Sequence, residues 1–225
     1  MVGDSHLQDG AEVAETSEAW EMRGLFAHPL EPDFVAVDVE TACSRVSSIC
    51  QIGIVGFKDG RELFAYESLI DPKDDFTAFN IRIHGIDPAK VAGQPSFGEA
   101  YHRIAGLLSG RVVVAHSSFD KHCIAAASRV HQAPPIHCRW LDTVRVSRRT
   151  WPELHSHRLN VIAASLGITF RHHDALEDAR TCGRIMAHAI AHTGIAVPDW
   201  DEELKSDGYA ERNWRRRQRR QAGQV

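Results

Sequence analysis

Apolar residues beyond residue 32 follow first a strand pattern and then a helical one. The run at 33–40 is rich in β-branched residues and predicts a strand buried on both faces. A second apolar run is followed by Asp59-Gly60, a dipeptide typical of a hairpin turn, so the third run is expected to pair antiparallel with the second. The predicted strands are 33–40, 49–57, 62–70, 111–115 and 136–141.

Helical spacing of apolar residues begins near residue 76 and alternates with the later strands. Ser96 with Glu99, and Asp174 with Glu177, have the spacing of helix capping boxes. Strands separated by helices imply helices packed on the faces of a mixed sheet. The expected fold class is therefore α/β, with a mixed five-stranded sheet flanked by helices. The predicted helices are 76–83, 96–108, 118–131, 142–149, 159–166 and 174–192.

Composition divides the 225 residues into three parts. Residues 1–32 are polar and acidic, and we expect them to be disordered. Residues 33–194 carry the periodic pattern and are expected to form one domain. Residues 195–225 show no periodic core face and end in an arginine-rich stretch, so a linker and a basic tail are expected there.

Charge and cysteine content limit the classes of partner. The net charge of the chain is −4, and its central part, between the acidic N-terminal segment and the basic tail, is near neutral. Nucleic-acid binding would therefore require metal ions or a local basic element such as the tail. The five cysteines form no Cys-x-x-Cys pair, and the N-terminus has no apolar targeting segment. No run of about 18 apolar residues occurs, so we expect no membrane span. A cytoplasmic location with reduced thiols is the simplest expectation.

Two carboxylates close the first predicted strand. Asp38 and Glu40 are two residues apart, a spacing that places both side chains on one face of a strand. Burial of two neighbouring carboxylates is costly unless they share a cation. The alternative is that the strand ends at Val37 and that both acids are solvated.

Two further acids fall near helix starts. Asp120 lies in the first turn of the helix after the fourth strand, where an acid also serves simply to compensate the helix dipole. With Asp174 as N-cap, His173 and Asp178 take the two positions of a hydrophobic staple. An imidazole and a carboxylate at those positions indicate a site, although a surface His–Asp pair has the same spacing.

Together these residues offer hard oxygen ligands without a cysteine or clustered-histidine pattern. Such donors suit Mg²⁺ or Mn²⁺ and disfavour zinc. One histidine with a pKa near neutrality can serve as general base beside them.

These motifs resemble the DEDDh branch of the DEDD 3′–5′ exonuclease superfamily, and in particular the proofreading exonuclease domains of bacterial replicative DNA polymerases and their stand-alone relatives. The chain departs from the family pattern at His116, which stands one residue closer to Asp120 than usual, and at Ala42, where the family usually has glycine. The similar segments are Asp38-Val39-Glu40-Thr41, Phe119-Asp120, His173 with Asp178, Ile83-His84-Gly85-Ile86 and Leu141-Asp142-Thr143.

The resemblance implies an RNase H-like fold and a two-metal mechanism that releases nucleoside 5′-monophosphates. It implies His173 as the general base. The residues it implies as ligands of two Mg²⁺ or Mn²⁺ ions are Asp38, Glu40, Asp120 and Asp178. The residues it implies near the terminal nucleotide are Thr41, Ala42, His84 and Phe119.

Substrate and partners stay open at this point. DNA with a single-stranded 3′ end is the first expectation and RNA the alternative, because the distinction depends on contacts to the 2′-OH. A nucleic-acid-binding module without catalysis is a different class, against which the complete set of acidic residues argues. The two terminal segments could also recruit a polymerase or repair partner, together with catalysis.

Overall fold

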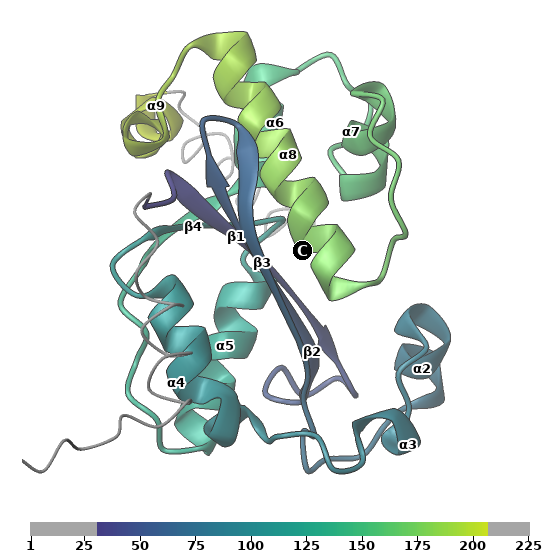
Figure 1. The fold of residues 1–225 in the computed structure, drawn as a ribbon. Helices are drawn as coiled ribbons and strands as arrows, with labels where there is room; N and C mark the ends of the chain where they lie inside the picture. The colour runs from purple at the N-terminus through teal and green to yellow at the C-terminus, as the bar shows by residue number, and fades with distance from the viewer. Residues whose placement is uncertain (1–30, 207–225) are drawn as a thin grey trace, which may run out of the picture. The chain divides into compact units, whose positions relative to one another are not determined.

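The structure, a computed structural model, describes residues 31–206. Its centre is a five-stranded sheet in the order β3-β2-β1-β4-β5. Figure 1 shows this sheet between two groups of helices. The first three strands form an antiparallel meander, and β4 and β5 run parallel to β1. The mixed five-stranded sheet expected from the sequence is therefore confirmed. The strands are β1 (Phe34–Thr41), β2 (Ile49–Lys58), β3 (Arg61–Leu69), β4 (Val112–Ala115) and β5 (Arg139–Asp142).

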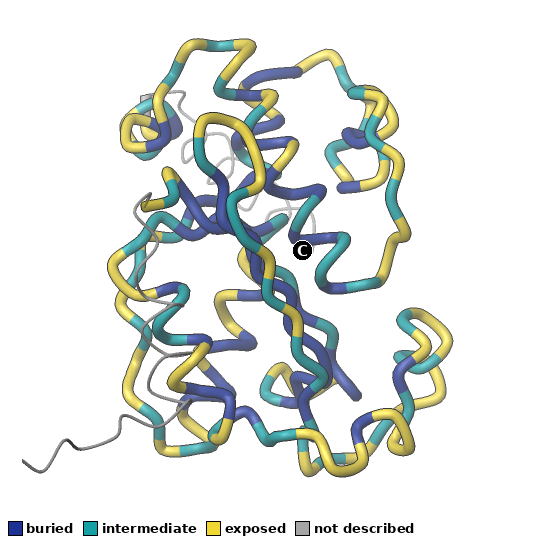
Figure 2. The backbone as a smooth tube through the Cα atoms, viewed as in Figure 1, coloured by how far each residue is buried: buried dark blue, intermediate teal, exposed yellow. Residues whose placement is uncertain are grey.

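Helices cover both faces of this sheet. Helices α4 and α5 pack on one face, and α6, α7 and α8 pack on the other, so that β1 and β2 are buried along most of their length (Figures 1 and 2). No helix within the described residues is long and apolar enough to cross a membrane. The helices are α2 (Ala78–His84), α3 (Pro88–Val91), α4 (Phe97–Leu108), α5 (Phe119–Val130), α6 (Thr143–Thr150), α7 (Leu159–Ser165), α8 (Ala175–Thr193), the 3₁₀ helix Val197–Asp199 and α9 (Trp200–Ser206).

Successive side chains of β1 point alternately to the two faces of the sheet, and each face has its own hydrophobic core. Phe34 and Ala36 join the core under α8, whereas Val35 and Val37 join the core under α4 and α5. Asp38 continues the even-numbered series, and Glu40 follows it, so both acids lie on the α8 face, as their spacing predicted. Because β1 extends to Thr41, the alternative that the strand ends at Val37 is wrong.

The expectation for residues 195–225 was wrong over its first part. Val197, Trp200 and Leu204 are buried in the core under α8, and Trp200 has no exposed surface. The three side chains are spaced three and four residues apart, which is helical spacing over a segment too short and polar to predict a core face. Of the segment 1–32, which was predicted to be disordered, residues 1–30 lie outside the described residues. The basic tail at 207–225 also lies outside them.

Gly53 allows α8 to lie directly against β2. It pairs with Asp38 across the β1–β2 ladder, and a Cβ atom at this position would overlap the carbonyl oxygen of Ala175 and the Cα atom of Leu176. The neighbour is helix backbone, which cannot rotate away as a flexible side chain does. The absence of a side chain at Gly53 therefore brings the first turn of α8 close to the end of β1.

Replacement of Gly53 by alanine is expected to destabilise the fold. Overpacking of this kind typically lowers the free energy of unfolding by about 1–3 kcal/mol, and Gly53→Val should cost more than Gly53→Ala. Urea unfolding of the two variants and the wild type measures the effect. Equal unfolding midpoints for all three proteins would contradict the close contact between α8 and β2.

Candidate active site

Acidic side chains from three elements meet at one edge of the sheet. The carboxyl ends of the parallel strands β1 and β4 lie at this edge, which is where open α/β sheets usually bind ligands. Asp38 and Glu40 come from β1, and Asp178 comes from the first turns of α8. One carboxylate oxygen from each of these three residues lies within 4.8 Å of the other two.

Asp120 joins this cluster from the start of α5. It is buried, and its Oδ1 atom accepts a hydrogen bond of 3.1 Å from the backbone N–H of Val39, between the two acids of β1. The charge of Asp120 also contributes to the raised pKa of Asp38. The structure thus brings together all four carboxylates predicted as ligands.

The start of α8 is held by two contacts, one local and one distant. Asp174 is the N-cap, and its side chain accepts from the N–H of Glu177 at 3.1 Å, as the capping-box spacing predicted. The buried side chain of Gln51 accepts from the N–H of Ala175 at 3.2 Å and donates to Glu67 at 2.7 Å. Gln51 therefore fastens α8 to β2, directly opposite Glu40 in the ladder.

Gln51 is a positioning residue that the sequence analysis missed. Its available signal was a single polar residue within the apolar run 49–57. A buried polar side chain needs a hydrogen-bond partner. The partners are 16 and 124 positions away along the chain, so the sequence does not indicate which ones it has.

The histidines before α8 differ from the expected arrangement in one respect. The imidazole Nδ1 of His172 lies 2.9 Å from Oδ2 of Asp178, whereas His173 contacts the same oxygen through its backbone N–H at 3.1 Å. The two imidazole rings are stacked, with their centroids 3.9 Å apart. His173 has a φ of 67°, in the left-handed region, so the chain turns sharply at this residue. Both imidazoles therefore lie beside the carboxylate cluster.

Burial and mutual repulsion disfavour ionisation of the whole cluster. Burial, together with the charges of Asp120 and Asp178, holds the pKa of Asp38 well above its usual range. Burial and the charge of Asp178 raise the pKa of Glu40 to about 8. Burial also raises the pKa of Asp120 to about 7, and it raises the pKa of Asp178, which His172 partly opposes. Four such carboxylates are all ionised at neutral pH only if cations neutralise them.

The donor set fits divalent ions that prefer oxygen. Carboxylates are the ligands of Mg²⁺ and Mn²⁺, and ion binding compensates the cost of burying negative charge. The coarse expectation of an acidic metal-binding site thus agrees with the arrangement of Asp38, Glu40 and Asp178.

The raised pKa values predict that the metal-free protein loses stability as pH rises. Glu40 has a pKa of about 8 in the folded state and an ordinary value of 4.5, so between these values the folded state binds more protons than the unfolded state. Stability therefore falls with rising pH across this window. Thermal unfolding in EDTA should show a lower midpoint at pH 8 than at pH 5.5, by about 2–4 °C for each kcal/mol lost.

Divalent ions should reverse this loss, with the largest effect at pH 8, because binding to the ionised cluster stabilises the folded state. Glu40→Gln serves as the matched variant, since it removes the charge and keeps the side-chain volume. It should show a weaker fall of the midpoint between pH 5.5 and pH 8 in EDTA. A wild-type midpoint that rises over this interval would contradict the repulsion within the cluster.

The predicted substrate contacts fall into two groups. Thr41 and Ala42 are buried, and the carbonyl oxygen of Thr41 accepts hydrogen bonds from Asn80 at 2.8 Å and from Nε2 of His84 at 3.2 Å. His84 thereby holds the end of β1, and burial lowers its pKa. Phe119 is 45% exposed next to Asp120, so its ring is available to a ligand. Ala42 has no exposed surface, and its backbone N–H and carbonyl oxygen already bond to Ser48 and Thr77, so the structure does not present it to a ligand.

Two residues of the similar motifs have structural roles. The Nδ1 atom of His116 lies 2.9 Å from the hydroxyl of Thr143, and its Nε2–H donates to the carbonyl oxygen of His157 at 3.0 Å. Burial lowers the pKa of His116 to about 4, so its imidazole is neutral. Asp142 is the N-cap of α6 and accepts from the N–H of Val144 at 2.8 Å. These contacts join β4 and β5 to the helices behind the site.

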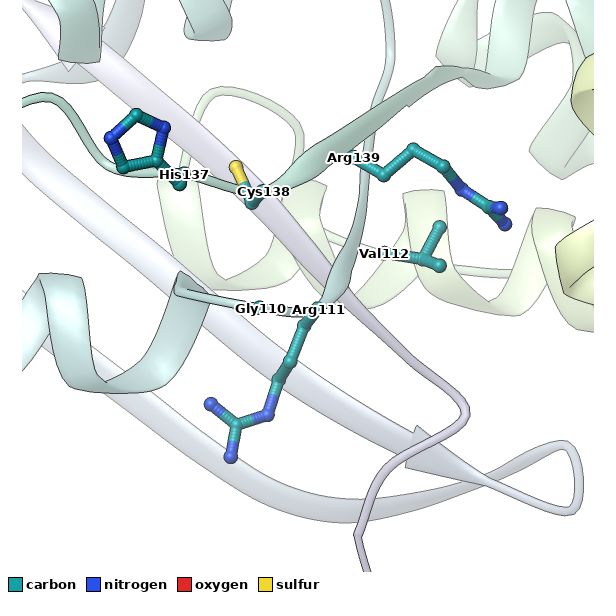
Figure 3. A pocket seen from close by; sticks show the side chains of 6 residues that line it. All are labelled: Gly110, Arg111, Val112, His137, Cys138 and Arg139. Atoms are coloured by element: carbon teal, nitrogen blue, oxygen red, sulfur yellow. The ribbon is translucent and has the colours of Figure 1, made fainter.

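A separate hollow lies at the opposite ends of β4 and β5. It has a volume of about 450 Å³, and Figure 3 shows Arg111 and Arg139 extending away from each other at its border. The guanidinium of Arg111 donates to the carbonyl oxygens of Gly106 and Leu107, and that of Arg139 donates to Val197. These cations hold the fold together, and none of the four clustered carboxylates lines this hollow.

Comparison with known proteins identifies the family. The exonuclease family model named RNase T matches residues 35–186, which include all four clustered acids and both imidazoles. The chain belongs to this exonuclease family. The resemblance to 3′–5′ exonucleases of the DEDDh type is thereby confirmed.

The relatives include much longer proteins. The chain is 27% identical over 159 residues to the PolC-type DNA polymerase III of Clostridium perfringens, in a match that covers 69% of this chain and 11% of the relative. It is 28% identical over 173 residues to the corresponding protein of Caldanaerobacter subterraneus, covering 74% of this chain and 12% of the relative. The chain thus spans about a tenth of the length of the curated relatives that it matches.

Solved structures of exonucleases share the fold. Exonuclease X in complex with 5′ overhanging duplex DNA superposes with a TM-score of 0.59 at 20% identity, covering 72% of this chain and 93% of the other. The nuclease domain of 3′hExo, a DEDDh family member bound to rAMP, gives a TM-score of 0.62 at 16% identity, covering 71% and 92%. The RNase H-like architecture of this exonuclease family is therefore confirmed.

Proposed function

We propose that this member of the exonuclease family hydrolyses nucleotides from the 3′ end of DNA and releases nucleoside 5′-monophosphates. The observation that carries the proposal is the clustering of four carboxylates from β1, α5 and α8, two of them buried and two half-buried, beside two imidazoles. An isolated cluster of this kind destabilises a fold, whereas a pair of divalent ions makes it favourable. The ligands we propose for two Mg²⁺ or Mn²⁺ ions are Asp38, Glu40, Asp120 and Asp178.

Two bound divalent ions would supply Lewis-acid stabilisation of the negative charge that develops at the phosphate and at the leaving 3′ oxygen. The chain's own residues supply the remaining functions. His173 accepts the proton of the attacking water, since burial and the neighbouring His172 lower its pKa and keep its imidazole neutral at pH 7. Phe119, exposed beside Asp120, contacts the terminal nucleotide, and His84 holds the adjoining backbone of Thr41 in place.

DNA is favoured over RNA by the curated relatives, which are DNA polymerases. RNA is the second candidate, because the similar nuclease domain of 3′hExo is bound to rAMP. A binding module without catalysis is the third, and the complete set of four carboxylates argues against it. Relatives of the polymerase type also suggest a polymerase or repair partner, and the five unpaired cysteines suit a cytoplasmic location.

A cleavage assay with matched substrates tests the function. Single-stranded DNA and RNA of one sequence, labelled at the 5′ end, are incubated with the full chain in Mg²⁺ and in Mn²⁺. We expect stepwise shortening from the 3′ end, faster on DNA, with nucleoside 5′-monophosphates as products and no reaction in EDTA. Faster cleavage of RNA would exchange the two substrate assignments, and intact substrates under all conditions would refute the enzymatic function.

A further inference from the structure

Positive charge is concentrated in one segment of the chain. Residues 143–173, which comprise α6, α7 and the segments that lead to α8, contain five arginines, four histidines and one acid. The other described residues, 31–142 and 174–206, contain 21 acids and 14 lysines and arginines. A basic segment therefore lies within an otherwise acidic domain, and Figure 1 shows α6 and α7 on the same side of the sheet as α8.

We propose that the exposed side chains of Arg148 and Arg158, with the loop between them, bind the phosphate backbone of the nucleic-acid strand whose 3′ end enters the active site. Phosphate contacts supply affinity and carry no sequence information. Arginine suits them, because its planar guanidinium donates two parallel hydrogen bonds to one phosphate. The proposal rests on the proposed exonuclease function, to which it adds the path of the strand.

The loop between α6 and α7 is attached to the edge of the sheet that carries the acidic cluster. His116 follows the last residue of β4 at this edge, and its Nε2–H donates to the carbonyl oxygen of His157 at 3.0 Å. Arg158 is the next residue, so its backbone lies beside the same edge. Arg148 lies in the last turn of α6, about 7–8 Å along the helix axis from Thr143, whose hydroxyl lies 2.9 Å from Nδ1 of His116.

The charge of Arg148 acts on this edge of the sheet. Burial lowers the pKa of His116 to about 4, and the charges of His172, His157 and Arg148 add to this effect. Burial raises the pKa of Asp142 at the end of β5, and the charge of Arg148 is among the influences that oppose this rise. The last turn of α6 thus contributes positive potential where β4 and β5 end.

Two hydrogen bonds preorganise the loop. The imidazole of His157 donates through Nε2 to the carbonyl oxygen of Trp151 at 3.0 Å, while the carbonyl oxygen of His157 accepts from His116. Trp151 is buried in the core under α8. Because the loop is fixed at both ends, Arg158 loses little backbone freedom when a strand binds.

The five arginines of the segment differ in what they contact. Three of them bind protein groups: Arg145 donates to the carbonyl oxygen of Leu204, Arg149 to Glu203 and Arg171 to Asp174. Arg148 and Arg158 are exposed, and the guanidinium of Arg158 forms no hydrogen bond or ion pair with any described residue. A phosphate therefore reaches Arg158 without displacing a protein contact.

The other side of the site is weakly acidic. Helix α2 is attached to the end of β1 through Asn80, which donates to the carbonyl oxygen of Thr41 at 2.8 Å. Residues 71–90, which include this helix, contain four acids and three basic residues. The field of the domain thus draws a polyanion toward residues 143–173.

Binding measurements in EDTA test the surface in the absence of cleavage. Fluorescence anisotropy of a labelled single-stranded DNA is followed over a range of salt concentrations with the full chain. Arg148→Gln and Arg158→Gln should each weaken binding by about fivefold, as for a favourable exposed ion pair. Each should also lower the slope of log affinity against log salt by about 0.7, the value for one phosphate contact on a single strand.

Two matched variants control for charge and geometry. Arg129→Gln removes an equally exposed arginine in the last turn of α5, away from the basic segment, and should bind as the wild type does. Arg158→Lys keeps the positive charge and loses the two parallel hydrogen bonds, so it should keep the salt slope of the wild type. Equal affinities and salt slopes for Arg148→Gln, Arg158→Gln and Arg129→Gln would overturn the proposal.

Strands with single neutral linkages show whether the contact is direct. A methylphosphonate linkage removes one backbone charge and keeps the bases, and it is placed at successive positions from the 3′ end. At the linkage that Arg158 contacts, the substitution should weaken binding to the wild type and leave binding to Arg158→Gln unchanged. Equal effects on the two proteins at every position would overturn the direct contact.

The cleavage assay separates this surface from the proposed function. A wild type that binds the strand through these arginines and cleaves neither DNA nor RNA would refute the exonuclease function and retain the surface. Stepwise cleavage by the wild type, with unchanged affinity in both arginine variants, would retain the function and overturn the surface.

Discussion

Asp38→Asn is expected to reduce the rate of 3′ cleavage by about 10²–10³-fold, which is the scale of losing one preorganised charge-stabilising group in an active site. Asparagine keeps the size of the side chain and removes the negative charge that binds a divalent ion. Asp178→Asn should have an effect of the same size, because its oxygen lies within 4.8 Å of those of Asp38 and Glu40. Single-turnover cleavage of labelled DNA at saturating Mg²⁺ measures both.

Stability distinguishes this loss from simple unfolding. Removing one charge from a buried cluster relieves repulsion, so metal-free Asp38→Asn should unfold at a temperature equal to or above that of the wild type at pH 8. Asp33→Asn is the control, since Asp33 pairs with Lys58 at the other end of β1 and is partly exposed. It should cleave as the wild type does. Near-normal cleavage by Asp38→Asn would refute the assignment of the ligands.

Replacement of His173 is expected to cost about 10²–10⁴-fold in rate, the usual contribution of a general base. His172→Ala should lose no more than a few-fold, since its imidazole contacts Asp178 and is not assigned to the water. The two variants remove neighbouring, stacked imidazoles, so a difference between their rates identifies which imidazole acts as the base. A larger loss in His172→Ala than in His173→Ala would assign the base to the imidazole that contacts Asp178.

The pH profile gives an independent check on the base. A base acts in its neutral form, so the rate should rise as pH increases through the pKa of His173. Burial and the adjacent His172 lower that pKa from 6.5, so the rise should be centred below pH 6.5 at saturating Mg²⁺. The His173→Ala variant should lose this limb of the profile. Its persistence in the variant would show that another group titrates.

Local rules in the sequence determined most of the fold and the identity of the acidic residues. Period-two alternation placed Asp38 and Glu40 on one face of β1, and capping chemistry placed the start of α8 at Asp174. The turn at Asp59-Gly60 likewise indicated the β2–β3 hairpin. Each of these inferences depends on residues a few positions apart, whose geometry follows from backbone dihedrals alone.

Only the tertiary structure decided how distant segments meet. Gln51 holds α8 from 124 positions away, and Gly53 leaves room for the helix backbone. Trp200 fills the core from a segment that is too short and polar to predict a core face. The pairing of Asp178 with His172 also depends on the turn at His173, which has a positive φ. A glycine in the sequence would have indicated such a turn, because glycine adopts positive φ readily, whereas a histidine does not indicate it. Such contacts minimise the free energy of the whole packed core, so no local spacing rule specifies them.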